Sequence, residues 1–420
     1  MKLKFFLVAI FVVALSMRAS ADNWPQWRGP KNDGHSAEKN VPAEWSADKN
    51  IAWKFKMPGI GASTPAVWGD KMFVTSVDGQ DVVLICVGTD GKEKWKQKLS
   101  NTGEKRYKNP AGADVSDASA SCSTDGKHVW AFASNGALVC FTVDGTQVWA
   151  NDVSKFAKID IAFGSHWTPV LHKDKLFLQV MHRKAQKLVR YDALTGKEDW
   201  AVDRPGYSKG ESPDVYASAF IWEGAGESLL ISHGNDFCTG HRLTDGSEVW
   251  RVQGLNPSSS GAWRFVSNPL VTPDLIVVPS CKNGPTVGLN PVGAKGDITE
   301  DNKAEIWRIK TTPDVVSPIR VGDVIYMCSP GVFTAHELKT GKQIFRGEIA
   351  KGYHWSNMVT ADGKIYATSQ EGLTDVVQAG KEFKKIATNS LPDKIFGSPA
   401  IADGRLYFRG YGFLWAIGAK

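Results

Sequence analysis

The heptapeptide LTGKEDW (194–200) decides the fold, because close relatives of it recur along the chain. It joins a polar Thr-Gly turn to a tryptophan that opens the next strand. Similar segments are TDGKEKW (89–95), VDGTQVW (143–149), TDGSEVW (244–250), NKAEIW (302–307), KTGKQIF (339–345) and QAGKEF (378–383). KNIAW (49–53) lacks the glycine turn but has an aromatic residue at the matching position. The eight ring positions are Trp53, Trp95, Trp149, Trp200, Trp250, Trp307, Phe345 and Phe383, spaced by about 47 residues on average. A period of roughly 20–50 residues indicates a solenoid, a propeller or an array.

Each repeat contains short strands separated by turn residues. In the third copy they read HWTPVLHK, KLFLQVMH, KLVRYDAL and EDWAVDR, and no amphipathic helical stretch competes with them. Glycine after Asp or Thr suits the left-handed position that closes a hairpin. Four antiparallel strands per repeat, arranged in a circle, form a β-propeller blade.

The two ends of the repeat array predict how the circle closes. The last repeat (395–420) ends after three strands, and IAWKFKM (51–57) can supply the fourth. Such closure hides sheet edges that would otherwise pair with other chains. We therefore predict an all-β, eight-bladed β-propeller over residues 51–420, built of four-stranded antiparallel blades and closed by the N-terminal strand joining the C-terminal blade. The ring aromatics should dock neighbouring blades, with each indole N–H meeting a backbone acceptor.

The first residues have the layout of a secretory signal peptide. Lys2 and Lys4 precede an apolar stretch, and a small-x-small cleavage site ends at residue 21. No cysteine follows this site, so we expect no lipid anchor on the mature chain. The signal layout predicts export to the periplasm or outside the cell, with no transmembrane segment in the mature chain, and we expect a monomer. Cleavage lowers the formal charge from +6 to +3, which gives no reason to expect nucleic-acid binding.

Residues 22–50 are predicted to form an extended strap. Pro25 and Pro30 in WPQWRGP (24–30) disfavour a helix. Trp24 and Trp27 need cover, so we expect the strap to pack across the propeller surface. If they were exposed instead, the two indoles would mark a partner-binding patch.

The six cysteines allow disulfides in an exported protein, but their context favours another interpretation. Most lie in apolar runs such as VVLICV and ALVCF, where a cysteine usually acts as a small buried hydrophobe. There is no CxxC pair and no CxxCH haem motif. Their positions are Cys86, Cys122, Cys140, Cys238, Cys281 and Cys328.

Candidate ligand-binding residues lie in the loops that join one blade to the next at the channel mouth. Aromatic rings beside a cation, carboxylates and imidazoles could form a small-ligand cup, or could simply line a wet channel. The two His-Trp pairs lack a third ligand, so no metal site is predicted. GDITEDNKAE (296–305) lacks the central glycine of a calcium loop and is predicted to be a solvated insertion. The candidates are Asp114, Asp117, His166, Trp167, Tyr216, Arg264, His354 and Trp355.

The repeats TPAVWGDKMFVTSVDG (64–79) and LVRYDALTGKEDW (188–200) resemble the pyrroloquinoline-quinone (PQQ) repeat family of the quinoprotein alcohol dehydrogenase-like superfamily. The resemblance covers about residues 51–420. DNWPQWRGPKNDGHS (22–36) is similar to the start of exported bacterial PQQ-like propellers. The seven-bladed WD40 type fits less well, because none of the sixteen tryptophans is followed by Asp.

This resemblance implies one of two functions. One branch comprises alcohol and sugar dehydrogenases, which hold PQQ and calcium above the channel; the other is the non-enzymatic outer-membrane protein assembly factor BamB. The chain has no adjacent cysteine pair, no haem motif and no long inter-blade insertions. We therefore expect a non-catalytic BamB-type scaffold without a cofactor, which binds an envelope protein or a carbohydrate. The alternative is a PQQ- and calcium-dependent dehydrogenase.

Overall fold

The computed structural model describes residues 23–419, apart from 102–106, 109–113, 116, 205, 207 and 302, and only the backbone of 107, 108, 114 and 115. The expected signal peptide (1–21) lies outside the described residues. In the described part, the chain forms strands and one short 3₁₀ turn, Val153–Lys155. No helix in those ranges is long and apolar enough to cross a bilayer.

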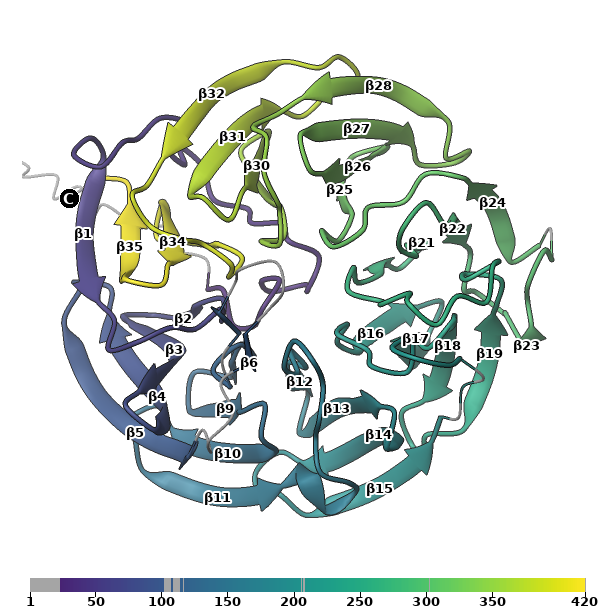
Figure 1. The fold of residues 1–420 in the computed structure, drawn as a ribbon, viewed down its shortest axis with the longest axis horizontal. Coiled ribbons are helices and arrows are strands. Elements are labelled where there is room, and N and C mark those ends of the chain that lie inside the picture. Colours follow the sequence, from purple (N-terminus) through teal and green to yellow (C-terminus); the bar gives the residue numbers. More distant parts are fainter. Residues whose placement is uncertain are drawn as a thin grey trace, which may run out of the picture.

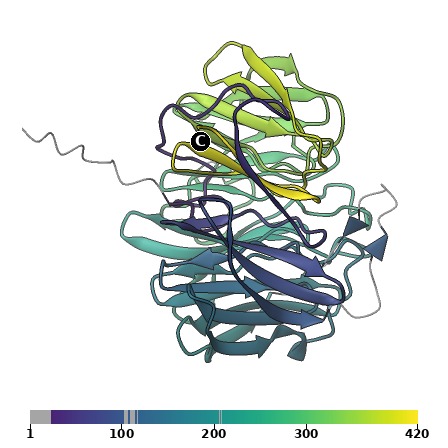
Figure 2. The same ribbon diagram turned by 90° about the vertical axis from the view of Figure 1, so that its left-hand side faces the viewer.

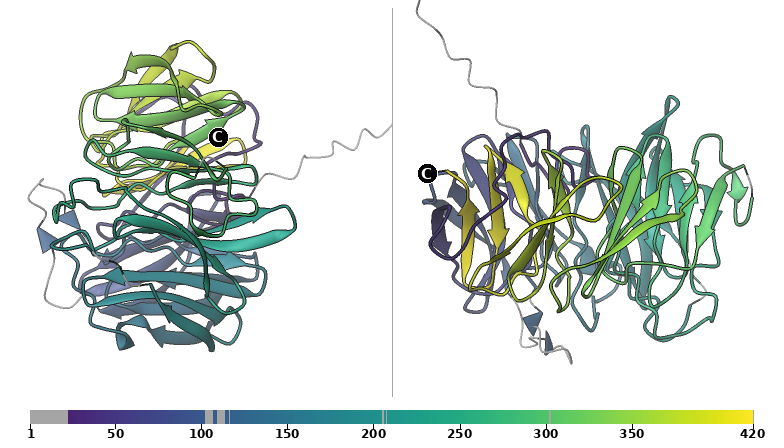
Figure 3. Two further views of the ribbon diagram at one scale, coloured as in Figure 1. Left: turned by 90° about the vertical axis from the view of Figure 1, so that its right-hand side faces the viewer. Right: turned by 90° about the horizontal axis from the view of Figure 1, so that it is seen from above.

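Eight sheets stand side by side in a ring around a central channel (Figure 1). Seen from the side, the ring is a thick disc, and the small β6–β7 pair lies off one of its flat faces (Figures 2 and 3). Neighbouring strands within each four-stranded blade are antiparallel, so the predicted architecture is confirmed.

The first four blades run from residue 66 to residue 252, and their strands follow one another outward from the channel. Blade 1 contains β2 (Ala66–Trp68), β3 (Lys71–Asp78), β4 (Asp81–Gly88) and β5 (Glu93–Asn101). Between it and blade 2 lie β6 (Tyr107–Lys108) and β7 (Asp114–Val115). Blade 2 contains β8 (Ser123–Thr124), β9 (His128–Phe132), β10 (Ala137–Thr142) and β11 (Gln147–Asp152). Blade 3 contains β12 (Val170–His172), β13 (Lys175–His182), β14 (Ala185–Asp192) and β15 (Glu198–Asp203). Blade 4 contains β16 (Phe220–Gly224), β17 (Glu227–Gly234), β18 (Phe237–Arg242) and β19 (Glu248–Val252).

The remaining blades repeat this order. Blade 5 contains β20 (Leu270–Thr272), β21 (Leu275–Val278), β22 (Thr286–Leu289) and β24 (Glu305–Ile309). Blade 6 contains β25 (Ile319–Val321), β26 (Val324–Ser329), β27 (Val332–Glu337) and β28 (Gln343–Glu348). Blade 7 contains β29 (Val359–Ala361), β30 (Lys364–Thr368), β31 (Leu373–Gln378) and β32 (Lys385–Ser390). Blade 8 contains β33 (Ala400–Ala402), β34 (Arg405–Arg409) and β35 (Phe413–Ile417), with β1 (Ile51–Lys56) as its outermost strand.

The ring closes in blade 8, as predicted. Strand β1 pairs antiparallel with β35, and Lys54 lies opposite Trp415. The Lys54 ammonium also lies 5.0 Å from the centre of the Phe413 ring. The first described strand of the propeller and the last one therefore share one sheet.

Most of the ring tryptophans bind the next blade as expected. The indole N–H of each donates to the backbone carbonyl at the start of the neighbouring blade's turn. These bonds join Trp53 to Thr89 (2.8 Å), Trp95 to Val143 (2.9 Å), Trp149 to Ala193 (2.9 Å), Trp200 to Leu243 (3.1 Å) and Trp307 to Leu338 (2.9 Å).

Trp250 is the exception. Its Nε1 is buried without a hydrogen-bond partner among the described residues, because blade 5 replaces the tight turn with the insertion that contains β23 (Gly296–Asp297). Most described residues of this insertion are exposed, as predicted, but Ile298 and Ala304 are buried. Strand β23 pairs with β19 in parallel, and Ile298 packs with Trp250 in the core. Phe345 and Phe383 keep the ring contact without an N–H, with centroids 5.8 Å apart.

Residues 23–50 cross the end of the channel opposite the mouth. The backbone of Trp24 pairs with Val67 of blade 1, and that of Ser36 donates to Thr360 of blade 7. Trp45 packs on Tyr366 and Phe408 of blades 7 and 8. Trp24 and Trp45 are buried, so these two indoles belong to the core.

All six cysteines are buried as free thiols. Each lies within or beside a strand of the core, and burial raises the pKa of the Cys122 and Cys238 thiols to about 12. They act as small hydrophobes, in agreement with the interpretation from their sequence context.

Candidate functional site

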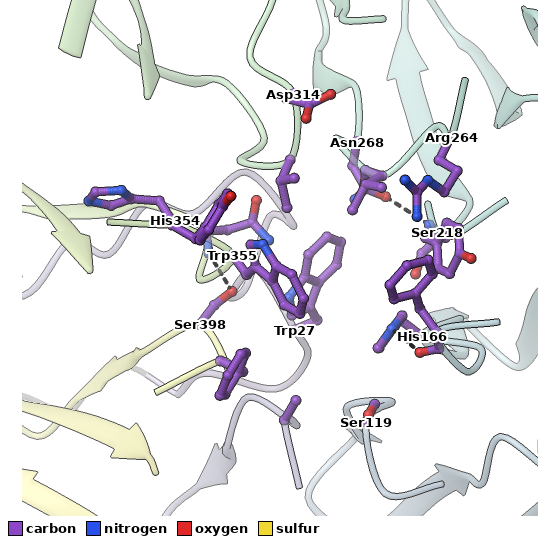
Figure 4. Close-up of a pocket in the computed structure, with 18 of the residues that line it drawn as sticks. Trp27, Ser119, His166, Ser218, Arg264, Asn268, Asp314, His354, Trp355 and Ser398 are labelled. Carbon is purple, nitrogen blue, oxygen red and sulfur yellow. Dashed lines mark hydrogen bonds between the residues drawn. The ribbon is translucent and has the colours of Figure 1, made fainter. Parts of the chain in front are cut away.

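A cavity of about 570 Å³ opens at the channel mouth. Its walls are the loops that connect the outer strand of one blade with the inner strand of the next (Figure 4). Trp27, from the N-terminal segment, enters the same cavity from the channel side. The cavity therefore combines loops from around the propeller with one residue that precedes it.

A ring of hydrogen bonds that links all eight blades, here called the annular hydrogen-bond ring, surrounds the base of the cavity. It consists of one residue from each blade, two positions before the start of the inner strand. In all but one blade, the backbone N–H of this residue donates to the side-chain oxygen of the corresponding residue in the next blade. Seven links are made: Thr64 to Ser121 (2.8 Å), Ser121 to Thr168 (3.4 Å), Thr168 to Ser218 (3.0 Å), Ser218 to Asn268 (2.7 Å), Asn268 to Ser317 (3.0 Å), Ser317 to Asn357 (2.6 Å) and Asn357 to Ser398 (2.9 Å). The eighth link is missing, since the buried Thr64 Oγ1 has no partner in the described structure.

Sequence reasoning missed this ring, although its signal is readable. All eight positions hold Ser, Thr or Asn, and five of them precede a proline, as in Thr64-Pro65 and Ser398-Pro399. Aligning the repeats on their inner strands instead of their aromatic turns would have revealed it.

One side of the cavity is aromatic. The Trp355 ring meets Phe396 edge-on at 5.4 Å, and Phe396 stacks on Tyr411 at 4.8 Å. Trp27 and Trp355 both line the cavity and project toward its middle (Figure 4). Neither indole N–H is bonded to a described residue. Two partly exposed rings with unused donors thus face the same space.

The other side carries Arg264. Its guanidinium lies 4.6 Å from the centre of the Phe163 ring, and its Nε is 3.3 Å from Glu211 Oε2. His166 Nε2 donates to the Phe163 carbonyl at 3.1 Å, and burial lowers the pKa of His166 to about 4. The imidazole is therefore neutral at neutral pH, and its ring packs on Tyr216.

Lys282 and Asp314 complete the charged lining. The Lys282 backbone N–H donates to Asp314 Oδ1 at 3.1 Å, while its ammonium donates to the Ala262 carbonyl at 2.6 Å. The described lining therefore holds two cationic and two anionic side chains.

Five of the eight predicted candidates line this cavity: His166, Tyr216, Arg264, His354 and Trp355. His354 lines it with its imidazole turned away (Figure 4), and its Nδ1 lies 3.2 Å from the Gly352 carbonyl. Burial lowers the His354 pKa.

The other three candidates do not contribute described side chains to the lining. Trp167 is fully buried, donates to the Val215 carbonyl at 2.8 Å and stacks on His182. Asp117 does not line the cavity, and burial raises its pKa to about 6. The Asp114 side chain lies outside the described part of the chain. Lining residues outside the eight candidates include Phe163, Glu211, Lys282, Asp314 and Phe396, together with Trp27, which the sequence singled out only as part of the N-terminal segment.

The described lining of the cavity offers two carboxylates, Glu211 and Asp314, as possible calcium ligands. Calcium takes six to eight oxygen ligands, several from carboxylates. Among the described residues, no three His, Cys, Asp or Glu side chains converge to hold a metal ion. Glu211 is paired with Arg264, and Asp314 accepts the Lys282 amide.

Comparison with known proteins identifies relatives of the fold. The sequence model of a family described as outer membrane protein assembly factor BamB matches residues 89–347. No curated protein sequence matches the chain significantly. Three similar solved structures show the fold alone, because their sequences are only 13–14% identical to this chain. BamB from Moraxella catarrhalis (13% identity, TM-score 0.63) covers 88% of this chain and 97% of its own. For a europium-containing methanol dehydrogenase, the identity is 14%, the TM-score is 0.70, and the match covers 94% of this chain and 90% of the dehydrogenase. For the quinohemoprotein alcohol dehydrogenase from Comamonas testosteroni, the identity is 13%, the TM-score is 0.69, and the match covers 95% of this chain and 81% of that enzyme.

Proposed function

Because the chain belongs to the PQQ-repeat family described as outer membrane protein assembly factor BamB, we propose that it is a non-catalytic, exported propeller of the cell envelope that binds a partner at its channel mouth. Membership of this family confirms the resemblance inferred from the repeats. The observation that carries the proposal is the aromatic cavity, whose charged groups are already engaged by one another and by the backbone.

The chemistry of the lining supports binding over catalysis. A general base must be within reach of the substrate with a pKa near the working pH. His166 has its Nε2 committed to a carbonyl and a pKa of about 4, and Glu211 is paired with Arg264. These groups are arranged to hold the cavity in shape.

The similar structures support the two functions unequally. The BamB structure and the family description favour a protein-binding role in the envelope, while the two dehydrogenases keep quinoprotein catalysis as the rival function. Fold alone does not decide between such functions.

A cofactor titration tests the non-catalytic part. PQQ with calcium is added to the purified protein, and tryptophan fluorescence and alcohol-dependent dye reduction are followed. We expect neither saturable quenching nor turnover. Saturable quenching accompanied by turnover would make the protein a dehydrogenase.

Site-specific crosslinking tests the binding part. A photoreactive amino acid replaces Tyr353, which lines the cavity and is 57% exposed. The matched control carries it at Leu194, which is 50% exposed in a β14–β15 turn on the opposite face. We expect an envelope component to be captured from position 353 and not from position 194. Equal capture from both positions, or none from either, contradicts binding at the mouth.

A further inference from the structure

We infer that the mouth cavity accommodates a pyranose ring of a neutral glycan, held between Trp27 and Trp355. This inference rests on the proposed binding function and names the chemical class that the cavity recognises. It also makes Trp27, which precedes the propeller, a ligand-contacting residue of the site.

The aromatic side of the cavity supplies the stacking surface. Trp27 and Trp355 both project toward its middle, and neither ring is fully buried (Figure 4). Trp27 is fixed from behind by Phe220 of blade 4, at 6.1 Å, and Trp355 by Phe396. The C–H faces of a pyranose pack on such rings, whose apolar body and polar N–H suit an amphipathic ligand.

The annular ring supplies hydrogen-bond donors beside these rings. Ser121, Ser218 and Ser398 line the cavity and are at most 4% exposed. Each Oγ accepts a backbone N–H, which leaves its hydroxyl proton unused among the described residues. The Asn357 side-chain N–H groups are likewise unused, since only its Oδ1 is bonded.

Together with the two indoles, these side chains form a set of donors near the base of the cavity. These donors face the cavity, so a ligand that displaces water from them must offer acceptors in return. A ligand rich in hydroxyl and ether oxygens satisfies them. A sugar offers such acceptors around its edge and C–H groups on its faces.

The charge balance favours a neutral ligand over a polyanion. The described lining has two charges of each sign, and Arg264 is already paired with Glu211 at 3.3 Å. A multiply charged ligand would lose its hydration in the cavity, and charges that are already paired would not offset that free-energy cost. A neutral sugar has no such cost.

The test is calorimetric titration of the full mature chain with cellotetraose, maltotetraose and tri-N-acetylchitotriose, together with an array of neutral glycans. We expect at least one neutral glycan to bind, with affinity reduced at least tenfold in Trp355→Ala and in Trp27→Phe. The Phe variant keeps a ring in the N-terminal segment, and an unchanged melting temperature shows that the segment remains in place. The matched control is Trp68→Ala, an indole 37% exposed at the end of β2 on the opposite face, which should leave binding unchanged.

The outcomes separate this inference from the proposed function. If no neutral glycan binds while position 353 still captures a protein, the glycan inference fails and the binding function stands. Glycan binding that survives both tryptophan variants overturns the assigned site. PQQ turnover overturns both proposals.

Discussion

At the scale of single residues, the turn glycine and the indole explain why the LTGKEDW pattern recurs. Gly196 has φ +70°, and a Cβ there would lie 2.6 Å from the Trp149 ring. Gly91, Gly145 and Gly341 meet the indole of the preceding blade in the same way. Glycine is required at these turns both for its backbone conformation and for the space that the indole occupies.

Replacing Gly196 with alanine tests this double requirement. The control is Gly226→Ala, a turn glycine with φ +82° whose added methyl group would have no atom within 4 Å. We expect Gly226→Ala to lose about 1 kcal/mol of unfolding free energy from backbone strain, and Gly196→Ala to lose about 1–3 kcal/mol more from displacing the indole. Urea denaturation measures both. Equal losses would show that the indole contact adds nothing.

Single residues also mark where sequence reasoning stopped. His166-Trp167 and His354-Trp355 look alike in sequence, yet Trp167 lies in the core and Trp355 in the cavity. The repeat period fixes which loop a residue belongs to. The direction of its side chain depends on the local path of that loop, which the repeat period does not predict.

At the scale of elements, the N-terminal segment acts as part of the propeller core. Trp45 is 4% exposed, and its backbone N–H donates to Asn389 Oδ1 at 2.8 Å. The prolines of WPQWRGP led us to expect an extended chain, but residues 27–32 form turns, in which the Gly29 N–H donates to the Gln26 carbonyl at 2.9 Å and the Asn32 N–H to the Gly29 carbonyl at 3.1 Å. That Trp27 would reach the mouth cavity was not predictable, because it depends on the width of a channel that only the assembled ring defines.

Removing the Trp45 side chain tests the packing of this segment. We expect Trp45→Ala to cost about 3–5 kcal/mol of unfolding free energy, the usual range for a buried aromatic. Trp68→Ala, at a partly exposed position, should cost less than about 1 kcal/mol. Guanidinium denaturation compares the two. Similar losses would mean that residues 23–50 add little to the stability of the ring.

The annular hydrogen-bond ring gives a second test between elements. Thr64→Val removes a buried hydroxyl that has no described partner, so stability should stay the same or rise slightly. Ser218→Ala leaves the Thr168 N–H without its acceptor and should cost about 1–3 kcal/mol. Thermal denaturation distinguishes these outcomes. A loss in Thr64→Val as large as in Ser218→Ala would show that the eighth link forms in solution.

At the scale of the whole molecule, the histidines make the fold sensitive to acid. Burial lowers the pKa of His166 and His241 to about 4 and of His233 to about 3, and it also lowers the pKa of His172, His182, His336 and His354. Unfolding exposes imidazoles with a pKa near 6.5. The unfolded chain therefore binds more protons between about pH 6.5 and 4, and stability falls as the pH decreases through that range.

Denaturation at pH 7, 6, 5 and 4 measures this effect. We expect a loss on the order of several kcal/mol, partly offset by Asp117, whose raised pKa of about 6 acts in the opposite direction. His233→Phe should reduce the slope by up to about 1.4 kcal/mol per pH unit. The exposed His35→Gln serves as its control. If stability does not depend on pH, or if both variants give the same slope, the buried histidines are not the cause of the acid sensitivity.

The repeat count predicted the ring and its closure, because the number of aromatic turns and the incomplete last repeat are both written in the sequence. The cavity was predicted only in outline. Its aromatic side combines Trp355, found from its loop, with Trp27 and Phe396, which the repeat pattern does not single out.

The pairing of β1 with β35 means that the propeller can close only late in translation. More than 350 residues separate the two partners, so the strand that leaves the ribosome first must wait for the one that leaves almost last. Intermediate blades can form in sequence while β1 stays an unsatisfied edge, prone to join a neighbouring nascent chain. The rate of translation thus sets how long the free edge of β1 can pair with another chain before β35 is available.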